Sequence, residues 1–213
     1  MASTLTKKIL IEFIGTFTLS IVICFIVINQ IDGFYGSFIV SFTLMILIYC
    51  GKNISGAHYN PAVTISIYYR GYCNKEELQY YIFFQLLGSI AASILYYYIF
   101  IPTNANYEIF DLNIFALISE FIFTFLLVSV ILNVATLDST KGNYYYGFAI
   151  ASVVFLGGIL VGDISLASFN PAVTIALILT GKINLLESWI HFIPQILSAF
   201  LATYLFKLYH KIE

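Results

Sequence analysis

The chain has 213 residues, of which 61% are hydrophobic and 9% are charged, with a formal net charge of −2. Because about 25% of the residues of an ordinary soluble domain are charged, this composition excludes a soluble globular domain and a strongly basic nucleic-acid-binding protein. It favours an integral membrane protein.

Six apolar runs are long enough to cross a bilayer, which requires about 20 residues. The runs at 9–28 and 112–135 contain one charged residue each, Glu12 and Glu120, and the other four contain none. No small-residue cleavage site follows the first run, so we expect a retained span rather than a removed signal. In chain order, the predicted transmembrane helices are 9–28, 33–51, 78–101, 112–135, 142–162 and 188–206.

Two further apolar stretches are too short to span alone. Each opens with an Asn-Pro pair, at 60–61 and 170–171, and each is followed by a glycine, Gly71 or Gly181. Asn is a favoured helix cap, Pro is favoured in the first helical position, and Gly commonly ends a helix. We therefore predict two re-entrant half-helices, with non-helical segments at 53–59 and 163–169 leading into them.

The chain also contains an internal duplication. Residues 54–65 and 164–175 share nine of twelve amino acids, 110 positions apart. Each copy has three spans, an odd number, so the second half is expected to cross the membrane in the opposite sense. The chain is predicted to be a single transmembrane channel domain, 1–213, made of inverted repeats at approximately 1–105 and 106–213.

The paired Asn-Pro-Ala motifs, each preceded by a Glu within a span, resemble the signature of the aquaporins, the major intrinsic protein family. The motif residues are Asn60, Pro61, Ala62, Asn170, Pro171 and Ala172. The resemblance implies an all-α membrane protein, an aquaporin-like bundle of six transmembrane helices plus two re-entrant half-helices. It also implies a homotetramer in a lipid bilayer, with the Asn60 and Asn170 amides donating hydrogen bonds to a passing molecule.

Several polar residues within the predicted bundle admit two interpretations. Glu12 and Glu120 are either proton-relay or ion-binding acids, or acceptors for backbone N–H groups of the re-entrant segments, which the resemblance favours. His58 matches the signature histidine and either lines the pore or braces its loop. Gln85, His191 and Gln195 are expected to join helices, as polar residues in spans commonly do. The tyrosine runs 96–98 and 144–146 are expected to form belts at the membrane surface.

The resemblance places the narrowest part of the pore at Val40, Gly158, Ala167 and Val173. Most aquaporins have an arginine where Val173 stands. Without it, neither a water-selective nor a glycerol-selective type is indicated. The expected function is a passive channel for water and/or small uncharged solutes such as glycerol, urea, ammonia or hydrogen peroxide. The alternatives are a structural or adhesive membrane protein of the same fold and, less favoured, a leaky ion channel.

The basic residues are distributed asymmetrically between the predicted loops. If the amino terminus is cytoplasmic, only Lys182 lies outside, so we expect both termini in the cytoplasm and the chain in the cell membrane. The residues expected on the cytoplasmic side are Lys7, Lys8, Lys52, Arg70, Lys75, Lys141, Lys207 and Lys211.

No motif indicates an enzyme, a cofactor, a metal site or nucleic-acid binding.

Overall fold

The computed structural model describes residues 4–31, 33–100 and 109–212. These residues form eight α-helices and two short 3₁₀ helices, and no strand occurs within the described ranges. The all-α prediction is therefore confirmed. The elements are α1 (Thr4–Ile28), α2 (Gly33–Ser55), α3 (Pro61–Arg70), α4 (Lys75–Phe100), α5 (Ile114–Thr136), η1 (Asp138–Thr140), α6 (Tyr146–Ser165), α7 (Pro171–Leu179), η2 (Leu185–Glu187) and α8 (Trp189–His210).

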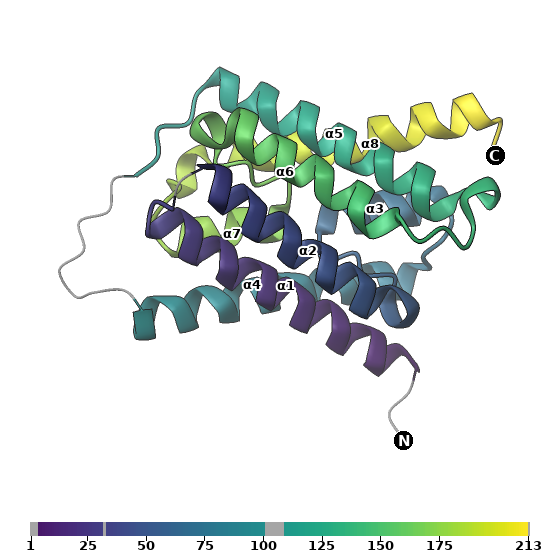
Figure 1. Cartoon of the computed structure of the whole chain (residues 1–213), viewed down its shortest axis with the longest axis horizontal. Helices are drawn as coiled ribbons and strands as arrows, with labels where there is room; N and C mark the ends of the chain where they lie inside the picture. Colours follow the sequence, from purple (N-terminus) through teal and green to yellow (C-terminus); the bar gives the residue numbers. More distant parts are fainter. Residues whose placement is uncertain (1–3, 32, 101–108, 213) are drawn as a thin grey trace.

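Six of the helices, α1, α2, α4, α5, α6 and α8, are long and apolar enough to cross a membrane. They run roughly along the long axis of the bundle, and the start of α1 and the end of α8 lie at the same end (Figure 1). We call this end the terminal end and the opposite one the distal end. The six predicted spans are thus present, and the chain is a multi-pass membrane protein.

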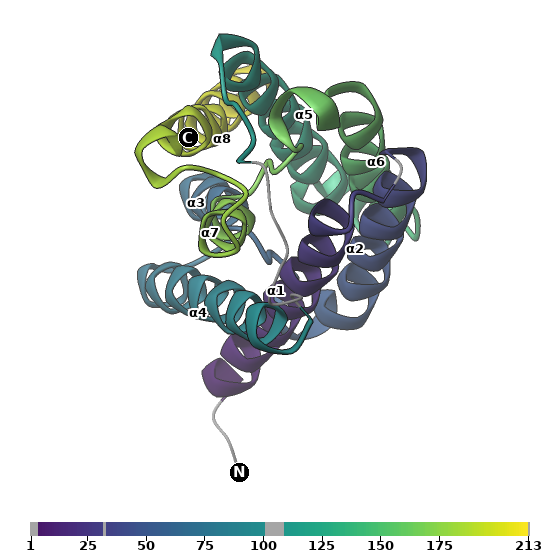
Figure 2. The same cartoon turned by 90° about the vertical axis from the view of Figure 1, so that its left-hand side faces the viewer.

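The half-helices α3 and α7 lie between the long helices (Figure 2). Each starts as predicted, because the side chain of Asn60 accepts a hydrogen bond from Ala62 N and that of Asn170 accepts one from Ala172 N, both at 2.9 Å. After α3 the chain turns at Gly71, whose φ of 91° lies in the left-handed region that glycine adopts readily. The capping signals in the sequence were therefore sufficient to predict both half-helices.

The non-helical segments are shorter than predicted. Helix α2 continues to Ser55 and α6 to Ser165, so the linkers into the half-helices comprise only residues 56–59 and 166–169. Each four-residue linker passes through left-handed backbone. Non-glycine residues in this region are strained unless their surroundings hold them there. The non-glycine linker residues with left-handed backbone are Ala57, Tyr59, Leu166, Ala167 and Phe169.

An aromatic ring anchors each linker in the bundle. The buried ring of Tyr59 lies so close to Gly15 on α1 that a Cβ there would overlap it. Its hydroxyl donates to Leu47 O at 3.0 Å. In the second half, the Phe169 ring stacks on Phe123 with ring centroids 5.3 Å apart. The linkers are therefore fixed at their last residue before the half-helix.

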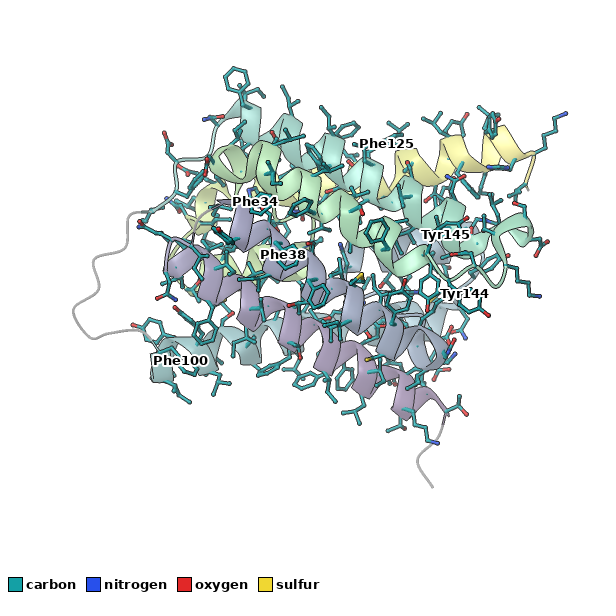
Figure 3. All side chains as sticks on the ribbon, viewed as in Figure 1. Phe34, Phe38, Phe100, Phe125, Tyr144 and Tyr145 are labelled. Atoms are coloured by element: carbon teal, nitrogen blue, oxygen red, sulfur yellow. The ribbon has the colours of Figure 1, made fainter. Side chains whose placement is uncertain are left out.

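Four of the six tyrosines predicted to form belts are exposed. Tyr97 and Tyr98 at the distal end are exposed, as are Tyr144 and Tyr145, which lie at the connection between α5 and α6 (Figure 3). Tyr96 is buried, because it packs between helices and its hydroxyl accepts a hydrogen bond from Asn29 Nδ2 at 3.0 Å. The prediction that Tyr96 belongs to a belt at the membrane surface was wrong. The sequence shows the run of tyrosines but not which face of α4 meets α1.

The predicted boundary between the repeats, near residues 105 and 106, lies outside the described residues. On either side of it, the described elements have the same order: two long helices, a half-helix and a third long helix.

Candidate pore

The two Asn-Pro-Ala motifs are joined by reciprocal hydrogen bonds. Asn60 Nδ2 donates to Phe169 O and Asn170 Nδ2 donates to Tyr59 O, each at 2.9 Å. An Asn side chain has two N–H donors and one carbonyl oxygen. The oxygen caps the half-helix and one N–H binds the opposite linker, so among the described residues the second N–H has no protein acceptor. It is available to a solute.

In the first half, the linker is organised around the carboxylate of Glu12. Oε1 accepts from Ser55 Oγ at 2.6 Å and from His58 N at 3.0 Å. Oε2 accepts from Tyr59 N at 2.7 Å and from Gln85 Nε2 at 2.8 Å. A fully buried carboxylate is costly unless hydrogen bonds compensate for its lost hydration, and these four do so.

In the second half, the carboxylate of Glu120 has the same arrangement. Oε1 accepts from Ser165 Oγ at 2.8 Å and from Ser168 N at 3.0 Å. Oε2 accepts from Phe169 N at 2.8 Å and from Gln195 Nε2 at 2.7 Å. Both glutamates thus bind backbone N–H groups of the re-entrant segments.

Four polar residues of these networks were not assigned to the site from the sequence. Gln85 and Gln195 were expected only to join helices, and Ser55 and Ser165 received no role. Their equal spacing in the duplication was an available signal, because each pair is separated by 110 positions, like Asn60 and Asn170.

His58 both braces the linker and faces the cavity. Its Nδ1 lies 3.2 Å from Thr64 Oγ1, and its ring meets Tyr81 edge to face with centroids 5.2 Å apart. It also lines the cavity that contains Asn60. The two interpretations of this residue are therefore compatible. His191 is fully buried, lies 3.3 Å from Thr174 Oγ1 and lines neither of the two cavities described below.

Two cavities extend from the middle of the bundle toward its ends. The terminal cavity, of about 260 Å³, contains Asn60 and Asn170 and reaches Lys8 and Lys52 at the terminal end. The distal cavity, of about 770 Å³, reaches Lys182. The two cavities share four lining residues, all apolar, which we call the junction: Ile23, Val40, Val154 and Ala167.

The four residues predicted at the narrowest place lie in and around this junction. Val40 and Ala167 belong to it, Val173 lines only the terminal cavity, and Gly158 lines only the distal cavity. A Cβ at Gly158 would overlap Ser37 of α2. Glycine at this position therefore also allows α2 and α6 to approach closely.

Sequence reasoning missed the other two junction residues. Val154 lies four residues before Gly158 on α6, and residues at this spacing share a helix face. This spacing could have identified Val154. No local signal indicates Ile23, because its neighbours on α1 are equally apolar.

The charged residues lie toward the two ends, away from the junction. Lys8, Lys52 and Glu77 line the terminal cavity, and Asp111, Asp163 and Lys182 line the distal one. Within the described ranges, no three His, Cys, Asp or Glu residues are arranged to hold a metal ion. The centre of the candidate pore therefore offers neutral hydrogen-bond donors next to an apolar junction.

Comparison with known proteins identifies a family for this chain. The "Major intrinsic protein" family model matches residues 2–146 and again residues 116–212. Nodulin-26 of Glycine max is 35% identical over 178 residues, which are 78% of this chain and 64% of that protein. "Probable aquaporin NIP4-2" of Arabidopsis thaliana is 33% identical over 79% of this chain and 62% of its own length. This chain thus spans less than two thirds of these two relatives.

Two further similarities cover nearly the whole chain. "Probable aquaporin NIP-type" of Nicotiana alata is 30% identical over 95% of this chain and 77% of its own length. The X-ray structure of the aquaglyceroporin from Plasmodium falciparum has the same fold, with a TM-score of 0.75, 22% identity and 95% of each chain covered. The chain belongs to the major intrinsic protein family.

Proposed function

We propose that this protein is a passive channel for water and/or small uncharged solutes. The observation that carries the proposal is the free N–H donor of both Asn60 and Asn170, in a cavity that meets a second cavity at an apolar junction. The fold is that of an aquaglyceroporin, and relatives are named as aquaporins. A catalytic role has no support in this site, which holds a hydrogen-bonded scaffold around neutral amides.

The central amides would recognise a solute through a lone pair on its oxygen or, in ammonia, on its nitrogen. The amino ends of α3 and α7 carry partial positive charge, equivalent to about half an elementary charge each. A neutral solute can accept a hydrogen bond from either asparagine, while a cation is repelled by the two helix ends. In this proposal the Glu12 and Glu120 networks hold the linkers in place and do not carry protons.

Selection by size would take place at the junction and at Val173. Val40, Gly158, Ala167 and Val173 provide no charge and no side-chain hydrogen bond. We infer that solutes larger than water, such as glycerol, urea, ammonia or hydrogen peroxide, are accepted. Water itself would pass slowly, because an apolar collar offers it no hydrogen bonds.

Flux measurements in proteoliposomes test this function. Stopped-flow swelling in glycerol and urea gradients should exceed that of protein-free liposomes, while shrinking in a sorbitol gradient should report water flux. Flux of every solute at the protein-free level, from protein shown to be folded, would contradict the channel and favour a structural or adhesive role.

We also propose that both termini lie in the cytoplasm and that the chain resides in the cell membrane. The support is the eight-to-one distribution of basic residues, combined with the position of the start of α1 and the end of α8 at one end of the bundle (Figure 1). A reporter enzyme that works only in the cytosol is expected to be active when it is fused after Glu213. Activity of an extracytoplasmic reporter at this position would contradict the orientation.

Assembly as a homotetramer, with one pore in each subunit, is proposed from family membership. Cross-linking or native mass measurement in mild detergent should give a species of four chains. A population containing only monomers would contradict this prediction.

A further inference from the structure

The terminal mouth of the candidate pore holds two lysines in different electrostatic environments. Lys8 Nζ on α1 forms an ion pair with Glu77 Oε1 on α4 at 2.5 Å. Lys52 Nζ on α2 lies 3.2 Å from the centroid of the Tyr146 ring on α6. All three charged residues line the terminal cavity. Within the described residues Lys52 has no carboxylate partner. Of the two lysines at this mouth, only Lys52 therefore has a positive charge that no acidic side chain neutralises.

Tyrosine side chains hold Lys52 at this mouth. Tyr146, which also lines the cavity, contacts the Tyr49 ring with centroids 5.1 Å apart. The Tyr49 hydroxyl donates to Tyr144 O at 2.7 Å, which ties α2 to the start of α6. An aromatic face attracts an ammonium group through its quadrupole but supplies no negative charge. The lysine is thus positioned without being neutralised.

A simpler explanation for Lys52 is orientation of the protein in the membrane. Lysines at the ends of spans commonly extend their ammonium groups toward the lipid headgroups. Lys52 instead is half-buried and directed across the helix pair α2 and α6, over a ring that lines the cavity. Its position therefore calls for a role within the pore.

We propose that Lys52 is a specificity-determining residue that disfavours the entry of cations at the terminal mouth. The inference rests on the proposed channel function. A positive charge beside a narrow aqueous mouth with low-dielectric walls raises the energy of an entering cation and leaves a neutral solute little affected. At physiological ionic strength such a charge acts over about 8 Å.

The distal mouth differs in charge. Its cavity is lined by the exposed carboxylates of Asp111 and Asp163 together with Lys182. Two acidic groups and one basic group do not make a net positive entrance. Rejection of cations by side chains is therefore expected at the terminal end, in addition to the effect of the helix ends near Asn60 and Asn170.

Ion leak is the first test. Lys52→Gln should raise potassium leak into proteoliposomes under an imposed potential about tenfold, with the rise shrinking as ionic strength increases. Lys52→Arg should restore the wild-type leak because it keeps the charge. The matched control is Lys207→Gln, since Lys207 also lies over a tyrosine ring, 5.5 Å from the Tyr69 centroid, but lines neither cavity. An unchanged leak in Lys52→Gln would overturn the inference.

A second test does not depend on transport. Ala135 is exposed and lines the same cavity, so Ala135→Cys can be introduced after replacing Cys24, Cys50 and Cys73 by serine. The introduced cysteine is treated at low salt with an anionic and, separately, with a cationic methanethiosulfonate. We expect Lys52→Gln to lower the ratio of the anionic to the cationic reaction rate about tenfold. An equal ratio with and without Lys52 would overturn the inference. If the protein passes no neutral solute, the channel proposal fails, while this ratio still decides the role of Lys52.

Discussion

Replacing Glu120 by alanine is expected to remove most of the folded protein from the membrane fraction. The change leaves the backbone N–H groups of Ser168 and Phe169 and the hydroxyl of Ser165 without their acceptor inside the bundle. It also removes one acceptor of Gln195, which keeps Thr174 Oγ1 at 3.2 Å. Each unsatisfied buried donor costs about 1–3 kcal/mol. Three of them are comparable with the total stability of about 5–15 kcal/mol that is typical of a native protein.

The corresponding glutamine variant should be milder. Glu120→Gln keeps the size of the side chain and one carbonyl acceptor, so it can retain part of the network and some solute flux. Folded yield is measured by size-exclusion chromatography in detergent, followed by proteoliposome flux. Glu76→Ala, an exposed glutamate in the first turn of α4, is the matched control and should behave as wild type.

The outcome separates the two interpretations of the buried glutamates. Low yield for Glu120→Ala together with residual flux for Glu120→Gln supports a scaffold that holds the linker. Normal yield with abolished flux in both variants would contradict it and favour a proton relay. The same experiment at Glu12 should give the same pattern, because its carboxylate also accepts two backbone N–H groups.

Replacing Val173 by arginine is expected to reduce glycerol and urea flux at least tenfold and water flux much less. Val173 lies in the first turn of α7 and lines the terminal cavity, where it supplies only an isopropyl group. A guanidinium there would fill part of a cavity of about 260 Å³ and add five N–H donors and a positive charge. Larger solutes would be excluded, while water would gain hydrogen-bond partners.

Two further variants separate bulk, charge and misfolding. Val173→Leu adds volume without charge. It should lower glycerol flux without giving water the hydrogen-bond partners that Val173→Arg supplies. Because Val173 is almost fully buried, Val173→Arg can also fail to fold, and Val40→Phe narrows the junction from α2 instead. This variant should likewise reduce glycerol flux more than water flux. A wild-type protein that passes water rapidly but excludes glycerol, urea and peroxide would show that this account of the pore is wrong.

Local signals in the chain were enough to predict the elements of the fold. Runs of about 20 uncharged residues have few alternatives to a membrane span. An Asn cap followed by Pro, with a glycine about ten residues later, specifies the start and end of a half-helix from neighbouring residues alone. The duplication of residues 54–65 at 164–175 then related the two half-helices to each other.

Packing between distant helices set the remaining features. The linkers are four residues long because a carboxylate more than 40 positions earlier binds their N–H groups and holds left-handed backbone that local preference disfavours. Ile23 and Val154 reach the junction, and Lys52 reaches Tyr146, through the rotation and approach of whole helices. Such relations arise from side-chain volumes at helix contacts, for which neither hydropathy nor capping residues provide a signal.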